Sequence, residues 1–522
     1  MFYILDETKK FLFWGMVSLS FLGCKKETEN SEIRYPNVIY VFPDQMRNHA
    51  MDFWNEPEYR KYINFTPDPV YTPNLRQFAE KSIVLTSAMS NCPLSSPHRG
   101  SLLTGMYPEN SGVSLNCNSN RPVSSLRQDA MCIGDVFKQS GYECAYIGKL
   151  HVDYPTLNNP QRPGEYVEDR NPVWDAYTPP ERRHGFNYWY SYGTFDVHKQ
   201  PHYWDTDGCR HEINEWSPKH ETDKAISYLR NEDRVRDETK PFFMMISYNP
   251  PHSPYKSLDD CMEDDYNLYK DRSLSDLLVR PNADTTMQKA SCAKYYFASI
   301  TGVDREFGRI LDELKRIGLE ENTIVVFTSD HGETMCSQGT NDPKNTPYAE
   351  SMNVPFLICY PARLKPGVDH ELLLSTPDIM PTLLGLSGIE DKIPDTVEGR
   401  NYADWLIGKD RTIPVRDAAL YIRNTDGEKD ADDKVISYFP ISRGIKTKDY
   451  TWSLTIDKQS KKLEEALLFH DSEDPYQMKN LSLVENEEII RLLSKKLASL
   501  LKEAHDPWYR EKILNDLIPY DK

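Results

Sequence analysis

The sequence lacks three features, and each absence excludes a class of protein. No apolar run in the 522 residues is long enough for a protein that crosses a membrane several times. None of the ten cysteines stands in a tight Cys-x-x-Cys pair, so nothing supports a structural zinc site, and spacing alone assigns no disulfide. Positive charge is also scarce: 62 Lys and Arg face 80 Asp and Glu, and the net charge of -18 argues against general nucleic-acid binding. An anionic substrate would need a locally basic pocket.

The N-terminal residues have the pattern of an export signal. Lys9 and Lys10 precede an apolar run over residues 11–23, which is short for a membrane span. The run ends in Phe-Leu-Gly-Cys, which resembles a bacterial lipobox with Cys24 as the lipidated residue. We therefore expect residues 1–23 to be a signal peptide and residues 24–35 to be a polar tether. The mature protein is expected in the periplasm or at the outer membrane, attached through a lipidated N-terminus.

The body of the chain alternates predicted strands and helices. Helical spacing of apolar residues covers 290–317 and 378–386. This alternation predicts an α/β fold with a large, mostly parallel sheet and helices on both faces. The strands are predicted from short runs rich in β-branched and aromatic residues over 37–42, 142–147, 242–247, 323–329 and 354–359.

The last quarter of the chain has a different pattern. Short strands are predicted over 451–456 and 467–470, and an amphipathic helix over 487–504. We therefore expect a main domain over residues 36–408 and a smaller C-terminal α+β subdomain with an antiparallel sheet over residues 409–522.

Polar residues follow four of the predicted strands where each strand ends. Open α/β sheets bind ligands at the carboxyl ends of their strands. One acidic residue at such a place is usually a helix cap, but four separate segments together predict a shared site. The residues are Asp44, Gln45, Lys149, His151, His252, Asp330 and His331.

Residues 95–105 carry the most specific motif, Ser-Ser-Pro-His-Arg-Gly-Ser-Leu-Leu-Thr-Gly. It resembles the signature of the type I sulfatases, C/S-x-P-x-R followed by x-x-L-L-T-G. In that family the first residue is oxidised to formylglycine (3-oxoalanine), so the resemblance implies that Ser95 is modified. Serine at this position is typical of the bacterial Ser-type enzymes, which depend on a formylglycine-generating maturase. His98 stands where Ser or Ala is common.

Further motifs follow in the order of that family over residues 36–480. The resemblance implies an alkaline-phosphatase-like fold, with a large sheet flanked by helices and a smaller C-terminal subdomain. The matching segments are 37–45, the G-K-x-H segment 148–151, the S-D-N/H-G segment 329–332, the K-x-x-x-Y-x-E-S segment 344–351 before Val354-Pro355, the helix within 376–388, and 468–481.

The resemblance also implies one Ca²⁺ ion per chain. Its expected ligands are Asp44, Gln45, Asp330, His331 and the modified Ser95. Gln45 stands where many members have Asp, and His331 where many have Asn. Because both changes remove oxygen or negative charge, Mg²⁺ or a softer divalent metal stays open.

Catalytic roles follow from the same resemblance. Hydration of the formylglycine aldehyde gives a geminal diol, of which one oxygen attacks sulfur while the second lets the enzyme expel sulfate. Arg99 and Lys149 would orient the aldehyde and its diol, and His151 would be the base that acts on the diol. Lys344 and His252 would hold the sulfate, and His252 would protonate the leaving oxygen.

The substrate is less closely defined by sequence. Residues 179–204 are basic and aromatic, which suits an anionic glycan but also suits a loop with buried aromatic residues. We expect a sulfated oligosaccharide or polysaccharide, with galactose or N-acetylgalactosamine sulfate as the leading class. The candidate contacts in this segment are Arg182, Arg183, His198, Lys199 and His202.

Two alternatives remain open at this point. The first is a phosphodiesterase or phosphonate hydrolase of the same superfamily, although those enzymes generally use two metals. The second is a non-catalytic glycan-binding lipoprotein in which Ser95 is never oxidised.

Overall fold

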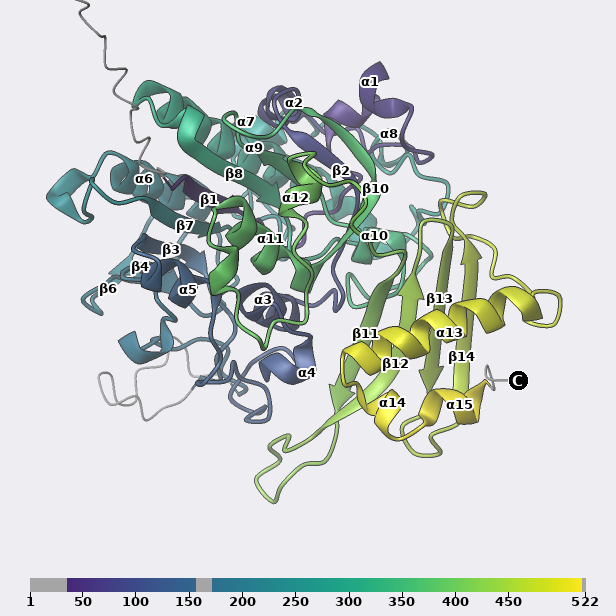
Figure 1. Ribbon diagram of the computed structural model, residues 1–522. Coiled ribbons are helices and arrows are strands. Elements are labelled where there is room, and N and C mark those ends of the chain that lie inside the picture. The colour runs from purple at the N-terminus through teal and green to yellow at the C-terminus, as the bar shows by residue number, and fades with distance from the viewer. Residues whose placement is uncertain (1–34, 156–170, 519–522) are drawn as a thin grey trace, which may run out of the picture. The chain divides into compact units, whose positions relative to one another are not determined.

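A ten-stranded sheet forms the centre of the computed structural model, which describes residues 35–155 and 171–518 (Figure 1). The strands lie in the order β10-β2-β9-β8-β1-β7-β3-β4-β5-β6. They are β1 (Asn37–Val41), β2 (Ile83–Met89), β3 (Glu143–Lys149), β4 (Tyr188–Tyr192), β5 (His202–Trp204), β6 (Arg210–Glu212), β7 (Phe242–Ser247), β8 (Thr323–Thr328), β9 (Phe356–Cys359) and β10 (Gly367–Ser375).

Parallel pairing dominates this sheet. β8, β1, β7, β3 and β4 pair in parallel, and so do β2 and β10. β9 runs antiparallel between β8 and β2, and β5 and β6 add an antiparallel edge. The predicted mostly parallel sheet is confirmed. Because β8, β1, β7 and β3 are parallel neighbours, the segments that follow them meet at one edge.

Helices cover both faces because strand side chains alternate between two cores. In β1, Ile39 and Val41 belong to one core, and Val38 and Tyr40 belong to the other. The first core includes residues of α2 (Pro73–Ala79), α6 (Ser217–Leu229) and α9 (Ala293–Arg316). The second includes residues of α3 (Ser95–Thr104), α5 (Ile133–Gln139), α11 (Ile379–Leu386) and α12 (Ala403–Leu406). Shorter helices are α1 (Pro57–Arg60), α4 (Pro108–Ser111), α7 (Glu263–Tyr266), α8 (Leu274–Leu277) and α10 (Ala349–Met352).

A second, antiparallel sheet lies in the C-terminal part of the chain (Figure 1). One face is covered by α13 (Glu487–Glu503), whose Leu497 and Leu501 share a core with Trp452 and Leu454. Two short helices follow, α14 (Pro507–Arg510) and α15 (Ile513–Leu517). The strands are β11 (Ala419–Asp426), β12 (Tyr438–Lys446), β13 (Tyr450–Ile456) and β14 (Leu463–His470).

Asn91 connects this second sheet to the loop that precedes α3. Its Nδ2 donates to the Leu420 carbonyl of β11 at 2.8 Å, and the Ile422 amide donates to its carbonyl at 2.8 Å. Its Oδ1 accepts from Ser375 and Thr376 at the end of β10. The C-terminal sheet therefore helps to fix the segment that leads into α3.

Three further predictions concern the N-terminal segment, the cysteines and membrane-spanning helices. The predicted signal peptide, Cys24 and the tether up to residue 34 lie outside the described residues. All nine cysteines within the described residues are free. In residues 35–155 and 171–518, no helix is long and apolar enough to span a bilayer.

Candidate active site

Loops and helix starts bring the predicted polar residues to one edge of the large sheet. Asp44 and Gln45 follow β1, Asp330 and His331 follow β8, and His252 follows β7. The remaining members are Lys149 at the end of β3, His151 just beyond it, Ser95 and Arg99 on α3, and Lys344 ahead of α10.

Ser95 is the buried centre of this cluster. It is the first residue of α3, and only 1% of its surface is exposed. Its Oγ lies 3.3 Å from Asp44 Oδ1 and 3.1 Å from His331 Nε2. The ammonium of Lys344 donates to the same oxygen at 3.4 Å. One hydroxyl is therefore surrounded by a carboxylate, an imidazole and a cation.

Arg99 holds the two acidic residues in place one helical turn after Ser95. Its Nη2 donates to Asp44 at 3.0 Å and to Asp330 at 3.1 Å. Its Nη1 donates to Ser247 Oγ at 2.7 Å and to the Lys149 carbonyl at 2.8 Å. The guanidinium thus connects α3 to the loops after β1 and β8 and to the last residues of β3 and β7. Its planar geometry suits paired carboxylates.

Asp44 and Asp330 form a buried acidic pair. Burial alone would raise the pKa of Asp44, but the charges of Lys149 and its cationic neighbours outweigh it and hold that pKa well below its usual range. Burial and the charge of Asp44 raise the pKa of Asp330 to about 7, against an opposing effect of Arg99. Such a pair shares one proton near neutral pH unless a cation replaces that proton.

These residues fit a divalent cation. Ligand atoms of Asp44, Asp330 and His331 all lie within 4.8 Å of one another. The Nδ1–H of His331 donates to the Gly332 carbonyl at 2.9 Å, so Nε2, which faces Ser95 Oγ, carries the lone pair that can bind a cation. Gln45 Oε1 is buried without a hydrogen-bond partner among the described residues. Such oxygen ligands suit Ca²⁺ or Mg²⁺, and the imidazole also suits softer metals.

Lys149, Lys344 and His252 form a basic wall around the cluster. Lys149 Nζ lies 2.8 Å from Asp44 Oδ2, and Lys344 Nζ lies 2.8 Å from His252 Nε2. Burial lowers the pKa of Lys344. Burial, Lys344 and Lys149 lower the pKa of His252. The wall provides the local positive charge that an anionic substrate requires in this acidic protein.

His151 has one ring nitrogen available for a proton. Its Nε2 lies 3.1 Å from the Cys117 carbonyl, so Nε2 carries the hydrogen that is donated there. Its Nδ1 is buried and has no hydrogen-bond partner among the described residues. Burial, with the charges of Lys149 and Arg99, lowers the pKa of His151 well below its usual value. The neutral ring can therefore act as a base.

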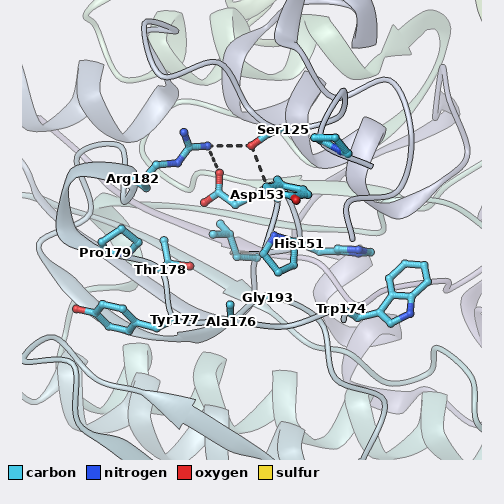
Figure 2. A pocket seen from close by; sticks show the side chains of 14 residues that line it. Ser125, His151, Asp153, Trp174, Ala176, Tyr177, Thr178, Pro179, Arg182 and Gly193 are labelled. Atoms are coloured by element: carbon cyan, nitrogen blue, oxygen red, sulfur yellow. Dashed lines mark hydrogen bonds and ion pairs between the residues drawn. The ribbon is translucent and has the colours of Figure 1, made fainter. Parts of the chain in front are cut away.

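A cavity lies beside His151 (Figure 2). Its volume is about 260 Å³. Trp174, Tyr154 and Arg182 contribute to its walls. The Nη2 of Arg182 donates to Asp153 and, at 3.1 Å, to Ser125 Oγ. The hydroxyl of Tyr154 accepts from Lys434, in the connection between β11 and β12, at 3.1 Å. The connection between β11 and β12 therefore contacts a residue of the cavity wall.

The five predicted substrate contacts differ in burial and in whether they line the cavity. Arg182 lines the cavity, and Lys199 is partly exposed. Arg183 is buried and donates to the Thr178 and Thr206 carbonyls and to the Tyr177 hydroxyl. His202 is buried, with Nε2 2.6 Å from Asp175, and His198 is buried 3.5 Å from Asp260. A contact with substrate remains a prediction for all five, and three of them have protein partners in the interior.

Sequence reasoning missed several residues next to the cluster. Asn249 accepts from Lys149 at 3.0 Å, and its position just after β7 was a usable signal. Glu333 accepts from the Gln45 amide, and it closes the Ser-Asp-His-Gly-Glu run. Asp196 lies 3.3 Å from His252 Nδ1. Neither Asp196 nor Trp174 has a local pattern that distinguishes it from an ordinary loop residue.

The arrangement can bind and neutralise an anionic group in front of Ser95. Lys344 contacts the buried Ser95 oxygen, and Lys149 and Arg99 contact Asp44 next to it. Electrostatic stabilisation is strong at such a place because water is excluded. His151 offers a lone pair, and His252 can carry a proton. Attack at a negatively charged ester centre needs cations that neutralise charge, a base, and an acid for the leaving group.

Comparisons with known proteins agree with this chemistry. The sulfatase family profile matches residues 36–389, and a profile for the C-terminal part of N-sulphoglucosamine sulphohydrolase matches residues 340–503. An endo-4-O-sulfatase of Bacteroides thetaiotaomicron is 62% identical over 97% of this chain and 100% of that protein. An ulvan-active sulfatase of Formosa agariphila is 33% identical over 93% of this chain and 86% of that protein.

A solved structure also supports membership of the sulfatase family. A structure from work on the metabolism of multiple glycosaminoglycans by Bacteroides thetaiotaomicron is 63% identical, with a TM-score of 0.92 over 93% of this chain and 100% of that one. The family profile covers most of the chain, and the order of the motifs agrees with it. The chain therefore belongs to the sulfatase family and is a sulfuric ester hydrolase with the alkaline-phosphatase-like fold.

Proposed function

We propose that this sulfatase removes 4-O-sulfate groups from within a sulfated glycosaminoglycan. The observation that carries the proposal is the buried Ser95 hydroxyl, which is contacted by Asp44, His331 and Lys344. The position of the ester and the internal mode of action follow the 62% identical endo-4-O-sulfatase. The sulfated unit expected from the sequence, N-acetylgalactosamine sulfate, is compatible with this class of glycan.

Each residue of the cluster has a specific task in this reaction. Asp44, Gln45, Asp330 and His331 would hold a divalent cation, with Ca²⁺ as the leading candidate, and that cation would stabilise negative charge. Ser95 in its formylglycine form would supply the nucleophile. The guanidinium of Arg99 keeps the acidic pair oriented, because it contacts both carboxylates.

The basic wall binds the ester and moves protons. Lys344, whose ammonium contacts Ser95 Oγ, would hold the sulfate together with His252. Lys149, whose ammonium contacts Asp44, would orient the diol. His151 takes a proton from the diol at its Nδ1, and this nitrogen has no protein partner among the described residues. His252 gives a proton from Nε2 to the leaving sugar oxygen, since that nitrogen faces Lys344 and the cluster.

Cellular location and maturation belong to the same proposal. The basic N-terminal residues and the apolar run before Cys24 support export, with lipidation at Cys24. A location in the periplasm or at the outer membrane gives access to imported or external glycans. Ser95 at the signature position requires a maturase that acts on serine.

Two measurements on one preparation test the proposal. Protein from the native host is digested, and the peptide that contains Ser95 is weighed; formylglycine is expected as a loss of about two mass units. The same protein is given 4-O-sulfated glycosaminoglycan oligosaccharides, and free sulfate is measured. Ser95→Ala is the control and is expected to release none. Unmodified serine together with phosphodiester turnover exceeding sulfate release would overturn the proposal.

A further inference from the structure

The cavity beside His151 meets the catalytic cluster at only one residue. His151 belongs to its described lining, whereas Ser95, the metal-ligand candidates, His252 and Lys344 do not. A sugar ring that carries the sulfate ester must lie against those groups. The cavity is therefore placed for the next ring along the chain.

The walls have the chemistry of a saccharide site. The indole of Trp174 is only partly buried and stands edge-on to His151, with ring centroids 6.0 Å apart. Tyr154 and three prolines add apolar surface, and Figure 2 shows Trp174 and Arg182 on different sides of the cavity. Small-molecule sites typically combine such apolar and aromatic walls with a few fixed polar groups.

Arg182 is the fixed polar group. Its Nη2 is held by Asp153, Ser125 and the Leu126 carbonyl. Within the described residues, its Nε and Nη1 make no hydrogen bond. A guanidinium that is anchored through one nitrogen presents the others in a defined direction, which suits a sugar hydroxyl or carboxylate.

The volume limits the occupant. The cavity measures about 260 Å³, near the lower end of the range for small-molecule pockets. It has room for one sugar ring rather than for several. Gly193 also lines it, and the chain continues beyond β4 from there to Asp196, which contacts His252. The cavity and the proposed proton donor are thus connected by four consecutive residues.

We propose that this cavity receives the sugar unit next to the sulfated one, with Trp174 as the stacking platform and Arg182 as the hydrogen-bond donor. The inference rests on the proposed function, because it assumes a glycan substrate. Trp174 acts as a specificity residue, since it contacts the substrate away from the reacting atoms. Binding energy from such a remote unit is available to improve turnover of the longer substrate.

Kinetics on substrates of two lengths test this inference. For wild type, Trp174→Ala and Trp174→Phe, kcat/KM is measured with a 4-O-sulfated oligosaccharide and with the matching sulfated monosaccharide. Trp174→Ala is expected to lower the ratio of the two values about three- to tenfold, and Trp174→Phe to restore most of it. Tyr62→Ala is a matched control, because Tyr62 is an exposed aromatic residue in a different cavity. It should keep the wild-type ratio.

Binding to an inactive enzyme separates this inference from the proposed function. In a Ser95→Ala background, the Kd of the oligosaccharide is measured with and without Trp174→Ala. A Kd about three- to tenfold weaker supports the inference even if sulfate release fails. A Kd and a kcat/KM ratio that do not depend on Trp174, or the absence of oligosaccharide binding, overturn the inference while leaving sulfatase activity intact.

Discussion

The ammonium of Lys344 lies 2.8 Å from Nε2 of His252. Because an ammonium only donates, His252 accepts through Nε2 and is neutral in the free site. Its Nδ1–H donates to the Ser253 carbonyl at 2.6 Å. A bound sulfate ester adds negative charge beside both groups and favours the protonated imidazole that a leaving oxygen needs. Substrate binding and proton donation are therefore linked through this contact.

Replacing Lys344 with methionine should impair sulfate binding and turnover together. The variant loses the cation beside Ser95 and the partner of His252. Loss of one such electrostatic group is expected to lower kcat/KM roughly 10²- to 10³-fold. The measurement is sulfate release under steady-state conditions, with the exposed Lys409→Met as control. Full activity of Lys344→Met would show that this lysine does not contact the ester.

Asp330→Ala should abolish activity while the fold is retained. Asp330 contributes to the candidate metal site, but it lies in a loop after β8, and Arg99 keeps its contact with Asp44. Circular dichroism is expected to match wild type, and sulfate release is expected to fall to background. Wild-type protein treated with a chelator should lose activity and regain it with Ca²⁺. Activity of Asp330→Ala at saturating Ca²⁺ would contradict the metal assignment.

Asn91→Ala should lower stability and activity together. The substitution leaves the Leu420 carbonyl, the Ser375 hydroxyl and the Thr376 amide without this partner. Unpaired buried groups lower the free energy of unfolding by about 1 to 3 kcal/mol each, and partial relaxation reduces the sum. Urea denaturation measures the loss, with the exposed Asn55→Ala as control. Unchanged stability would mean that Asn91 does not fix the segment before α3.

Glu398→Gln should change how stability depends on pH. Burial raises the pKa of Glu398 to about 7 from an unfolded value of 4.5, while its carboxylate accepts from Tyr107 and Asn110. Between these values the folded chain binds more protons than the unfolded chain, so stability falls as pH rises through this window. The fall is complete above pH 7.

Glu398→Gln lacks the titrating carboxyl group, so its free energy of unfolding should depend less on pH than that of wild type. Urea unfolding is measured from below pH 4.5 to above pH 7. Stability of Glu398→Gln relative to wild type is expected to increase with pH, because glutamine stays neutral. The exposed Glu428→Gln is the control and should follow wild type. A difference that stays constant with pH would contradict the raised pKa.

Local sequence patterns identified many elements correctly. The strand predicted over residues 242–247 has the same bounds as β7, and the helix predicted over 487–504 differs from α13 by one residue. The run over 354–359 became β9, but its antiparallel direction was not predicted. Direction depends on which strands pair, and that pairing joins residues far apart in the sequence.

The sequence alone determined the chemistry at the strand ends, because each motif lies within a few residues of the strand or helix that positions it. Asp44 and Asp330 were predicted from their places at strand ends, and Ser95 and Arg99 from a motif that resembles the sulfatase signature. Only the tertiary structure decided which basic residues of the 179–204 segment face the interior. His202, for example, is buried against Asp175. Burial depends on long-range packing between segments, and no short pattern records it.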